Sequence, residues 1–444
     1  MPAPSLDAVA NLAKRRGFIV QSSEIYGGAA AAYDYGPLGV ELKNNLKRLW
    51  WEDMTRRYEN IVGLDAAIFM HPKVWEASGH VEAFSDLLVE CRTCHKRFRA
   101  EEVSKDACLA CGAKKSFTEP RKFNLMFRTH LGPTEDAGST VYLRPETAQG
   151  IYADAPYIQQ VMRLKLPFGI AQIGKAFRNE VTPGNFIFRT VEFEQAEMQF
   201  FVRPSEADRW FEHWKEERMR WYHTVLGFPN DTVRFHPHAK KELAHYAKAA
   251  DDIQYHFPID WQEIEGVHNR GDWDLSRHAK FSGKDLSFFD EDTKEKVLPW
   301  IIETSAGVDR VLLALLTQAY TEETVKEAGA AGRGAGEKRL VLKLPRHLAP
   351  VRAAVFPLLS NNDELVAKAQ EISRELRQHF VIQYDDAGAI GRRYRRQDEI
   401  GTPHCVTVDH VSLEDNTVTV RDRDTLRQDR VRCGDALIAC LRTV

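Results

Sequence analysis

The chain has 444 residues, of which 43% are hydrophobic and 28% are charged, and its formal net charge is −3. This length suffices for two or three domains with sizeable cores, and the near-neutral charge excludes a uniformly basic nucleic-acid coat, so a nucleic-acid partner must be bound by local patches. The apolar run at residues 311–316 is far shorter than the ~20 residues that span a bilayer, and the polar N-terminus lacks a signal-peptide pattern, so we expect a cytoplasmic protein.

The first predicted element covers residues 34–54, which begin with a turn and continue as a helix. Pro37 suits the first helical turn. The apolar residues recur at helical spacing: Leu38, Leu42, Leu46, Leu49 and Trp50. This stripe fits either an amphipathic helix packed on its own core or a helix at a subunit interface.

The next segment, residues 88–120, contains two Cys-x-x-Cys pairs separated by thirteen residues: Cys91, Cys94, Cys108 and Cys111. This spacing suits a tetrahedral zinc ribbon. A ribbon that has lost its metal, or a redox pair, is the alternative. The seven cysteines of the chain include just this one tight cluster, which indicates a reducing compartment rather than a disulfide framework.

Residues 122–150 are predicted as short strands that lead into a short helix, and residues 168–180 and 186–201 as a hairpin around Pro183 and Gly184. Alternate strand residues share a face, which places Arg178 beside Glu180. It also groups residues of the return strand: Arg189, Val191, Phe193, Gln195 and Glu197. Guanidiniums, an acceptor and an aromatic ring together suit a nucleoside phosphate. The hairpin therefore predicts a nucleotide site without a glycine-rich loop.

Helices are predicted at 205–225, 238–251 and 307–320, and strands at 253–260 and 297–305. Ile301, Glu303 and Ser305 share one face of the last strand. Arg310 lies in the first turn of the following helix, where the helix N-terminus favours phosphate. One such arginine alone would be expected to pair with a surface acid, but three arginines in two strand–turn contexts favour a binding site.

Residues 329–338 are rich in glycine and alanine but lack the Gly-Lys-Ser/Thr pattern of a phosphate loop, so we predict a linker. The chain then changes to a β-α-β alternation, which predicts an α/β domain with a mixed sheet. Its most basic stretch, residues 391–399, fits either a solvated helix start with arginine–acid pairs or an RNA-phosphate contact in which Tyr394 stacks on a base.

Several of these motifs resemble those of the class II aminoacyl-tRNA synthetases. "FRNE" (177–180) with "RTVEFEQAE" (189–197) resembles motif 2, "ETSAGVDR" (303–310) resembles motif 3, and residues 34–53 resemble motif 1, the dimer-interface helix. Further segments, in the expected order, are similar to the homodimeric glycyl-tRNA synthetase family: "SSEIYGGAAAAYDYGPLG", "YLRPETAQGIY", "EIEGVHNRGDWDL" and "GRRYRRQDEIGTPHCVTVD". The resemblance covers nearly the whole chain, although Thr304 stands where the family usually has proline.

The resemblance implies an α+β fold in which a class II antiparallel-sheet catalytic domain at 1–328 contains a zinc-ribbon-like insert at 88–120. A linker at 329–338 and an α/β anticodon-binding domain at 339–444 would follow. The implied activity is ATP-dependent attachment of glycine to tRNA(Gly) through glycyl-adenylate, with release of AMP and pyrophosphate. The implied partners are glycine, ATP with Mg²⁺, tRNA(Gly), a structural Zn²⁺ and a second copy of the chain.

Carried over by position, the resemblance assigns catalysis to Arg178, on the α-phosphate, and Arg310, on the γ-phosphate. It implies these ATP-binding residues: Arg178, Asn179, Glu180, Phe188, Arg189, Thr190, Val191, Glu192, Phe193, Glu263, Ile264, Gly307, Val308, Asp309 and Arg310. It implies these glycine-binding residues: Arg99, Glu146, Phe193, Glu194, Gln195, Ala196, Glu197, Glu303, Thr304, Ser305, Ala306 and Gly307. Glu180 would accept from the adenine amine and Phe193 would stack on the ring.

Within this assignment, acids hold the glycine ammonium, while Glu303 and Ser305 exclude larger amino acids by steric clash. No general base is needed, because the glycine carboxylate is the nucleophile and catalysis is positioning plus charge stabilisation. Two alternatives remain at this point: a synthetase for proline, threonine or histidine, and a non-catalytic RNA-binding relative. The second should have lost the ATP arginines, yet Arg178, Arg189 and Arg310 are all present.

Overall fold

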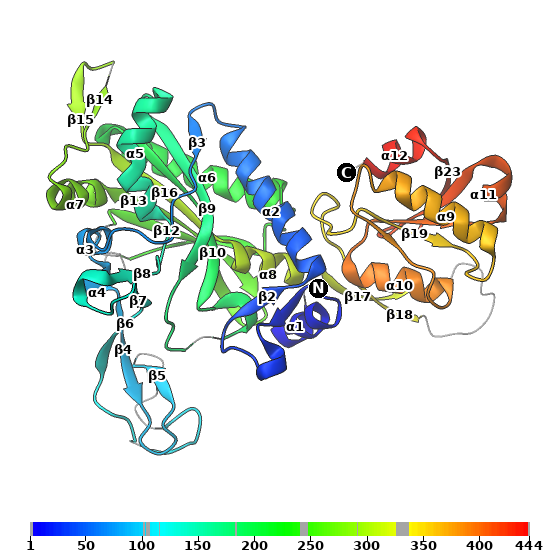
Figure 1. Cartoon of the computed structure of the whole chain (residues 1–444), viewed down its shortest axis with the longest axis horizontal. Coiled ribbons are helices and arrows are strands. Elements are labelled where there is room, and N and C mark those ends of the chain that lie inside the picture. The colour runs from blue at the N-terminus through cyan, green and yellow to red at the C-terminus, as the bar shows by residue number, and fades with distance from the viewer. Residues whose placement is uncertain are drawn as a thin grey trace.

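The structure is a computed structural model that describes residues 3–442 except 101–102, 104–106, 115, 183, 240–246, 291 and 326–336. These residues form a larger body, built around one broad sheet, and a smaller C-terminal body with a sheet of its own (Figure 1). Helices accompany a largely antiparallel sheet in the larger body and a mixed sheet in the smaller one, so the α+β prediction is confirmed. Within the described residues, no helix combines the length and apolar character that crossing a bilayer requires.

The larger body is organised on a seven-stranded sheet of order β11-β12-β13-β16-β10-β9-β3. Every neighbouring pair is antiparallel except β3 with β9. The strands are β3 (Ile61–Gly63), β9 (Phe168–Phe177), β10 (Glu192–Val202), β11 (Val233–Pro237), β12 (Ala249–Phe257), β13 (Asp260–Gly271) and β16 (Trp300–Gly307). The two central strands, β10 and β16, carry the motif 2 and motif 3 residues side by side.

Helices cover one face of this sheet completely and the other face only in part. The covered face packs on α1 (Leu6–Arg15), α2 (Pro37–Thr55), α6 (Ala207–Thr224) and α8 (Val308–Ala319). One end of the opposite face packs on α5 (Ala148–Met162) and α7 (Trp273–Ser282). Because strand residues alternate between faces, polar residues of β10 and β16 are left to line the uncovered part.

The hairpin of β9 and β10 is present, but its strands are shorter than predicted. Residues 178–191 form a loop with a 3₁₀ turn at Phe186–Phe188, so strand alternation does not place Arg178 and Glu180. The amide of Arg178 still donates to Val191 (3.0 Å), its partner in the β9–β10 register, but that of Asn179 donates to Leu125 (2.7 Å), outside the hairpin. Of the predicted turn, Pro183 lies outside the described residues.

The predicted helix at 238–251 is wrong at its end, where residues 249–251 begin β12; residues 240–246 lie outside the described part. The buried residues of β12 include Asp251, Ile253, Tyr255 and Phe257. Their period of two follows from pairing with β13, and it overrides the helix-favouring composition of the segment. The long strand β13 was not predicted. The strand predicted at 297–305 is divided between β15 (Glu295–Val297), paired with β14 (Phe288–Asp290), and β16.

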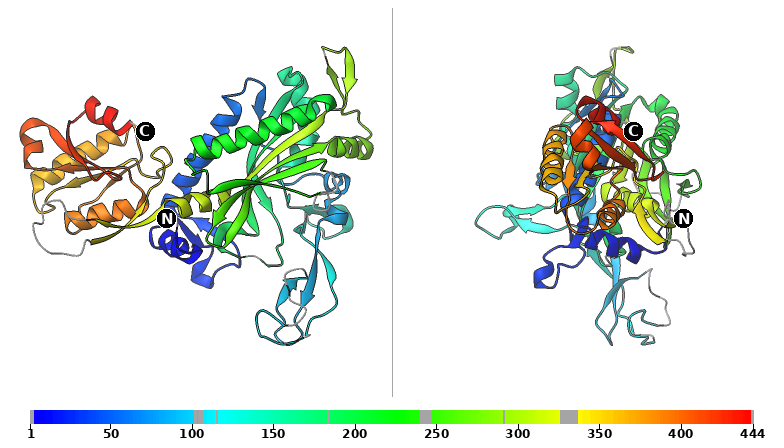
Figure 2. Two further views of the ribbon diagram at one scale, coloured as in Figure 1. Left: turned by 180° about the vertical axis from the view of Figure 1, so that it is seen from behind. Right: turned by 90° about the vertical axis from the view of Figure 1, so that its right-hand side faces the viewer.

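The cysteine-containing insert is a three-stranded sheet that extends away from the main sheet (Figures 1 and 2). Its strands are β4 (Ser85–Glu90), β5 (Arg97–Arg99) and β6 (Arg121–Asn124), in the order β5-β4-β6. The remaining elements of the larger body are small: β1 (Ile19–Gln21), β2 (Tyr33–Tyr35), α3 (Lys73–Ala77), α4 (His80–Ala83), β7 (Arg128–His130) and β8 (Thr140–Tyr142).

The two bodies are joined by an antiparallel pair, β17 (Tyr320–Val325) and β18 (Glu337–Leu342). Residues 329–336 of the predicted linker lie outside the described residues, and 337–338 belong to β18. The C-terminal sheet has the order β20-β19-β21-β22-β23 and is mixed, as predicted. Its elements are β19 (Ala353–Pro357), α9 (Asp363–Leu376), β20 (Ile382–Tyr384), α10 (Ile390–Ile400), β21 (His404–Val408), α11 (His410–Asp415), β22 (Thr417–Asp422), β23 (Gln428–Arg432) and α12 (Asp435–Arg442).

Candidate active site

A pocket opens on the uncovered face of the main sheet, between β10, β13, β16, the start of α8 and the 178–191 loop. It is lined by Glu146, Arg178, Glu180, Ile187, Phe188, Arg189, Thr190, Phe193, Glu194, Gln195, Glu197, Glu263, Gly266, His268, Arg270, Glu303, Ser305, Gly307, Asp309 and Arg310. Three buried carboxylates lie at one end and two arginines at the other. We call these the carboxylate end (Glu146, Glu197, Glu303) and the arginine end (Arg178, Arg310).

Glu303, on β16, is the most heavily bonded acid of the carboxylate end. Its Oε1 lies 2.7 Å from Nδ1 of His268, and both its oxygens accept from Nη1 of Arg270, at 3.3 and 3.0 Å. Gln199 donates to Oε2 at 2.8 Å. Burial alone would raise the pKa of Glu303, but the charge of Arg270 and the bond to His268 outweigh it and lower the pKa to about 2. Glu303 is therefore a fixed anion.

Glu197 faces Glu303 from β10, but its hydrogen-bond partners are neutral. Ser305 donates to its Oε1 at 2.6 Å and Gln195 at 3.1 Å, while Thr147 donates to Oε2. Burial and then the charges of Glu303 and Glu146 raise the pKa of Glu197 to about 8. Among the described residues, no cation donates a hydrogen bond to Glu197, although Arg144 interacts with it electrostatically. Glu197 would ionise readily if a cation came into direct contact with it.

Glu146 completes the carboxylate end from the segment just before α5. Gln149 donates to its Oε1 at 2.8 Å, and Nε2 of His80 lies 3.4 Å from its Oε2. Burial would raise the pKa of Glu146, but His80, Arg270 and Gln149 together hold it well below its usual range. Glu146, like Glu303, is therefore a carboxylate whose negative charge is already compensated by neighbouring groups.

At the arginine end, Arg178 lies between two aromatic rings. Its guanidinium carbon is 5.3 Å from the ring centroids of both Phe84 and Phe193, and its Nε donates to the carbonyl of Pro145 at 3.1 Å. The two aromatic rings and the carbonyl group together orient the Arg178 side chain. Its remaining N–H groups suit phosphate oxygens.

Arg310 projects from the first turn of α8, as predicted. Its Nε donates to the carbonyl of Phe188 at 3.2 Å, its guanidinium carbon lies 4.5 Å from the centroid of that ring, and Nη1 is 2.9 Å from Oε2 of Glu263. The Glu263 side chain is 46% exposed. Because an exposed pair of this kind is worth little, phosphate oxygens can replace it at small cost.

The pleat of the strands explains why some predicted residues do not line the pocket. Ala196, Thr304 and Ala306 alternate with lining residues and are buried on the opposite face. Other predicted residues also lie outside the lining: Asn179, Val191, Glu192, Ile264, Val308 and Arg99. Arg99 instead contacts Glu180, a lining residue, at 2.8 Å.

Sequence reasoning missed four lining residues: Ile187, Gly266, His268 and Arg270. The last three alternate along β13, and "GVHNR" is the signal that could have shown it. Glu263 shares their side of the sheet because β13 has one extra residue: Gln254 pairs with Glu263 but Ile253 pairs with Glu265. Such a bulge reverses the facing of every residue before it.

The helix that resembles motif 1, α2, contacts pocket residues from the helix-covered face of the sheet. Nζ of Lys43 on α2 lies 2.8 Å from both Glu194 and Asp309, and the amide of Glu194 donates to Asp309 at 2.8 Å. The predicted apolar stripe of α2 packs on the chain's own core, including Leu42 and Trp50. For this stripe the structure shows the amphipathic-helix alternative, not the interface.

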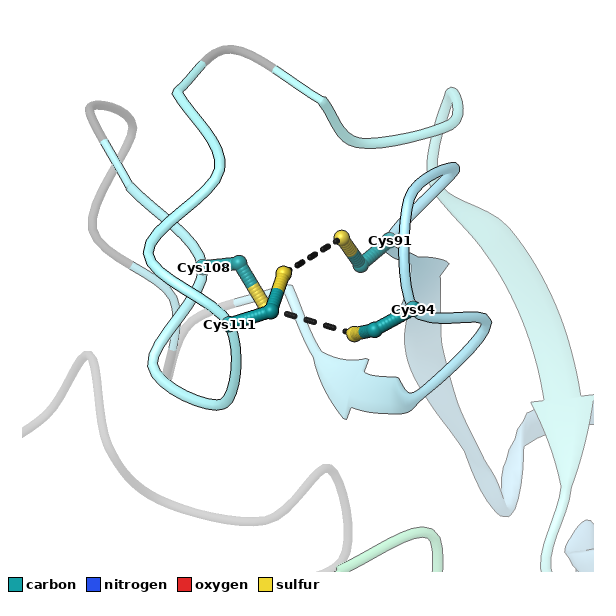
Figure 3. A group of neighbouring side chains, drawn as sticks. All are labelled: Cys91, Cys94, Cys108 and Cys111. Atoms are coloured by element: carbon teal, nitrogen blue, oxygen red, sulfur yellow. Dashed lines mark hydrogen bonds between the residues drawn. The ribbon is translucent and has the colours of Figure 1, made fainter.

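The four cysteines of the insert converge, as predicted (Figure 3). Sγ of Cys91 is 3.7 Å from that of Cys111, and Sγ of Cys94 is 3.8 Å from that of Cys108. A tetrahedral zinc with bonds of about 2.3 Å requires sulfurs about 3.8 Å apart. The backbone amide of Cys94 lowers the pKa of Cys91 to about 6, which favours the thiolate that a metal needs. The donor set therefore fits Zn²⁺.

The basic segment 391–399 forms most of α10, and Tyr394 is not free to stack on a base. Its hydroxyl lies 2.6 Å from that of Thr407, and its ring packs on Phe356 and under Arg421. Arg396 pairs with Asp385 at 2.6 Å. At these positions the structure favours arginine–acid pairing over base stacking.

Comparison with known proteins places the chain. Residues 127–319 match the family model "tRNA synthetase class II core domain (G, H, P, S and T)", and residues 352–442 match "Anticodon binding domain". The chain is 55% identical to a glycine–tRNA ligase of Treponema denticola over 433 residues, covering 96% of this chain and 94% of that protein. It is 53% identical to one of Streptomyces coelicolor over 450 residues, covering 97% and 96%. The chain belongs to the glycine–tRNA ligase family.

Membership of the glycine–tRNA ligase family confirms the resemblance seen in the motifs. The class II core model spans the elements from β7 to α8, which include every pocket strand, and the anticodon-binding model spans β19 to α12. The family match does not assign roles to individual residues.

Proposed function

We propose that the chain attaches glycine to tRNA(Gly) in two ATP-dependent steps. In the first, a glycine carboxylate oxygen attacks the α-phosphorus of ATP and the bond to the β-phosphate oxygen breaks, which releases pyrophosphate. In the second, a terminal ribose hydroxyl of the tRNA attacks the carbonyl carbon of glycyl-adenylate, and AMP leaves. The residues of the pocket orient both reactants and stabilise the charge that develops on phosphate.

The observation that carries this proposal is the uncompensated acid Glu197, enclosed at the carboxylate end. Among its described hydrogen-bond partners none is a cation, so the ammonium of glycine supplies the missing charge. Glu303 and Ser305 line the pocket beside it, and in this proposal they exclude any side chain larger than hydrogen by steric clash. A carboxylate held by neutral donors, in a closed site, suits the smallest amino acid.

For ATP, we propose that Arg178 contacts the α-phosphate and Arg310 the γ-phosphate, with Phe193 and Glu180 at the adenine. Mg²⁺, when bound, would supply positive charge that offsets the charge of the phosphates. It usually uses one or two carboxylates plus substrate oxygens, and Glu263, half-exposed beside Arg310, is the carboxylate placed to share it. Other predicted ATP residues that line the pocket, Phe188, Arg189 and Thr190, would form its wall.

Three further assignments are proposals. The four-cysteine cluster would hold a structural Zn²⁺, supported by its sulfur spacing. A homodimer is supported by the motif 1 resemblance; the outer side of α2, which includes Val40 at 41% exposure, would take part because the inner stripe is already buried. The cytoplasm is supported by the cysteine pattern, an odd number with one tight Cys-x-x-Cys cluster, which is typical of a reducing compartment.

The deciding test is amino-acid-dependent exchange of pyrophosphate into ATP, followed by charging of tRNA(Gly). Glycine should support exchange, while alanine, proline, threonine and histidine should not. Activation by proline or histidine without glycine would overturn the proposal, as would the absence of exchange with any amino acid in the metal-replete full-length chain.

A further inference from the structure

The root of the cysteine-containing insert contacts the first three residues of the 178–191 loop, which includes Arg178 of the arginine end. Phe84, just before β4, packs against Arg178; Leu125, just after β6, accepts from the amide of Asn179 at 2.7 Å; and Arg99, the last residue of β5, donates to Glu180 at 2.8 Å. The insert is therefore part of the wall that holds this part of the pocket.

The contact of Arg99 with Glu180 is the most specific of the three. Nε of Arg99 also lies 2.7 Å from Oδ2 of Asp86 on β4, in an orientation that makes this an ion pair rather than a directed hydrogen bond. One guanidinium thus bridges two carboxylates, and all three side chains are at most 20% exposed. A largely buried, charge-assisted pair of this kind fixes a side chain more firmly than an exposed pair does.

Glu180 needs such a partner because no regular element positions it. It lies in the 178–191 loop, and its own amide donates to the carbonyl of Arg178 at 2.9 Å, a local turn that leaves the side chain unsupported by a strand. Without Arg99, the carboxylates of Asp86 and Glu180 would repel each other.

We propose that Arg99 is a positioning residue that holds Glu180 for the adenine amine, and not a glycine-binding residue. This inference rests on the proposed function, in which Glu180 accepts from that amine. Arg99 is placed by the β4–β5 register, in which it faces Leu88, and the hairpin is closed by the amide of Cys91 donating to Lys96 at 2.9 Å. The insert therefore contributes to nucleotide selection from outside the sheet.

The test compares the full-length chain with Arg99→Met, Arg99→Lys and Glu180→Gln in glycine-dependent pyrophosphate exchange. The assay uses ATP and purine riboside triphosphate, which lacks the 6-amino group. Arg99→Met should raise KM for ATP about tenfold, keep KM for glycine within about twofold, and lower the preference for ATP over the analogue as Glu180→Gln does. Arg99→Lys, which keeps the charge, should restore part of that preference.

The matched control is Arg97→Met, on the same strand, where Arg97 is 61% exposed and pairs with Glu90 at 3.1 Å. It should leave both KM values and the preference unchanged. The inference is overturned if Arg97→Met changes the kinetic constants as Arg99→Met does. It is also overturned if Arg99→Met raises KM for glycine and not KM for ATP. A third contrary outcome is that Arg99→Met keeps the preference for ATP over the analogue while Glu180→Gln loses that preference. Unchanged preference in Glu180→Gln overturns the adenine assignment as well, and absence of exchange in the parent chain overturns the proposed function itself.

Discussion

The two ends of the pocket are held in different ways. At the carboxylate end, Glu197 and Glu303 project from the adjacent strands β10 and β16, and each is 3% exposed. The described partners of Glu303 lie on β10 and β13, and those of Glu197 lie on β10, on β16 and at the N-cap of α5. At the arginine end, Arg178 lies in a loop, and Arg310 is held by a carbonyl, a ring face and the half-exposed Glu263. One end is rigid and fully bonded, and the other is held by contacts that a ligand can replace.

The difference follows from what each substrate brings. Glycine offers an ammonium, a carboxylate and no side chain, so selection for it depends on a cavity that does not relax, because a hydrophobic site discriminates by only ~1–3 kcal/mol per methylene. ATP brings several charges and a metal ion, so the protein can hold arginines by weak contacts and exchange these for phosphate. Mutations at the two ends should therefore differ in the kinetic constant that they change.

The largest effect is expected for Arg178→Ala. In the proposed site it removes the cation assigned to the α-phosphate, where charge develops, and loss of one such donor costs about 10²–10³ in kcat. Because the described contacts of Arg178 are two ring faces and one carbonyl bond, the unfolding temperature should change little. Pyrophosphate exchange and thermal unfolding measure the two quantities.

The matched control for Arg178 is Arg209→Ala on α6. Arg209 also lies 5.3 Å from the centroid of an aromatic ring, that of Trp210, but is exposed and outside the pocket. It should keep full activity. If Arg178→Ala left the rate of pyrophosphate exchange unchanged, or if Arg209→Ala lowered that rate equally, the role assigned to the arginine end would be wrong.

Glu197→Gln should act mainly on glycine. Loss of one charged hydrogen bond costs about 1.5–3 kcal/mol, which corresponds to a rise in KM for glycine of about 10- to 100-fold, whereas KM for ATP should stay nearly constant. An equal rise in both constants would show that Glu197 supports the whole pocket and does not bind glycine. Steady-state exchange with each substrate varied in turn separates the two cases.

The same carboxyl group predicts how pH acts. Burial and neighbouring acids raise the pKa of Glu197 to about 8, so below that pH glycine binding must release its proton. Affinity for glycine should increase as pH rises from 6 to 8, by at most tenfold per unit, and Glu197→Gln should abolish this slope. The sign for stability is opposite: a raised acid pKa stabilises the folded state below the ordinary value of 4.5, and this stabilisation is lost as pH rises towards 8.

The carboxylate end was easier to predict from the sequence than the arginine end. Glu303 and Ser305, and likewise Gln195 and Glu197, lie on regular strands where a period of two determines facing, and each pair lines the pocket. For Arg178 and Glu180 the same rule gave the right facing, since both line the pocket, but not the right structure, because the regular strand ends at Phe177. The amide of Arg178 still bonds to Val191, its partner in the β9–β10 register, whereas that of Asn179 bonds to Leu125. Local alternation carries no information about such long-range partners.

His268 and Arg270 were missed for a related reason. Their strand, β13, pairs with β12 and β16. β16 is distant in sequence, and the start of β12 has a helix-favouring composition that led to a helix prediction. A bulge beside Ile264 then changes the facing of Glu263. Bulges depend on pairing between strands, so one sequence does not reveal them. The overall fold was predicted well because the family motifs fix the order of elements, which local patterns do not.

Ser305→Ala tests the rigid end with a smaller change. It removes the hydroxyl that donates to Glu197 at 2.6 Å, and one hydrogen bond is worth about 1 kcal/mol, so KM for glycine should rise about fivefold. The adjacent Thr304→Val is the control, since Thr304 is buried on the other face and its hydroxyl has no described partner. If Thr304→Val raises this constant as much as Ser305→Ala, then strand alternation does not define the site.

The smallest effect is expected for Cys94→Ala, which tests whether the insert belongs to the arginine end. It removes one of the four cysteines proposed to hold zinc, so metal content by mass spectrometry should fall from one zinc per chain to none. The β4–β5 backbone pairing remains, so Arg99 should be loosened but not lost, and KM for ATP should rise by about two- to threefold, less than with Arg99→Met. KM for glycine should not change, because the described partners of Glu197 and Glu303 all lie outside the strands of the insert.

Cys433→Ala in the C-terminal body is the control and should keep both zinc and activity. If Cys94→Ala raised KM for glycine more than KM for ATP, the insert would support the carboxylate end and not the arginine end. The difference between the two ends would then not follow from their contacts with the insert.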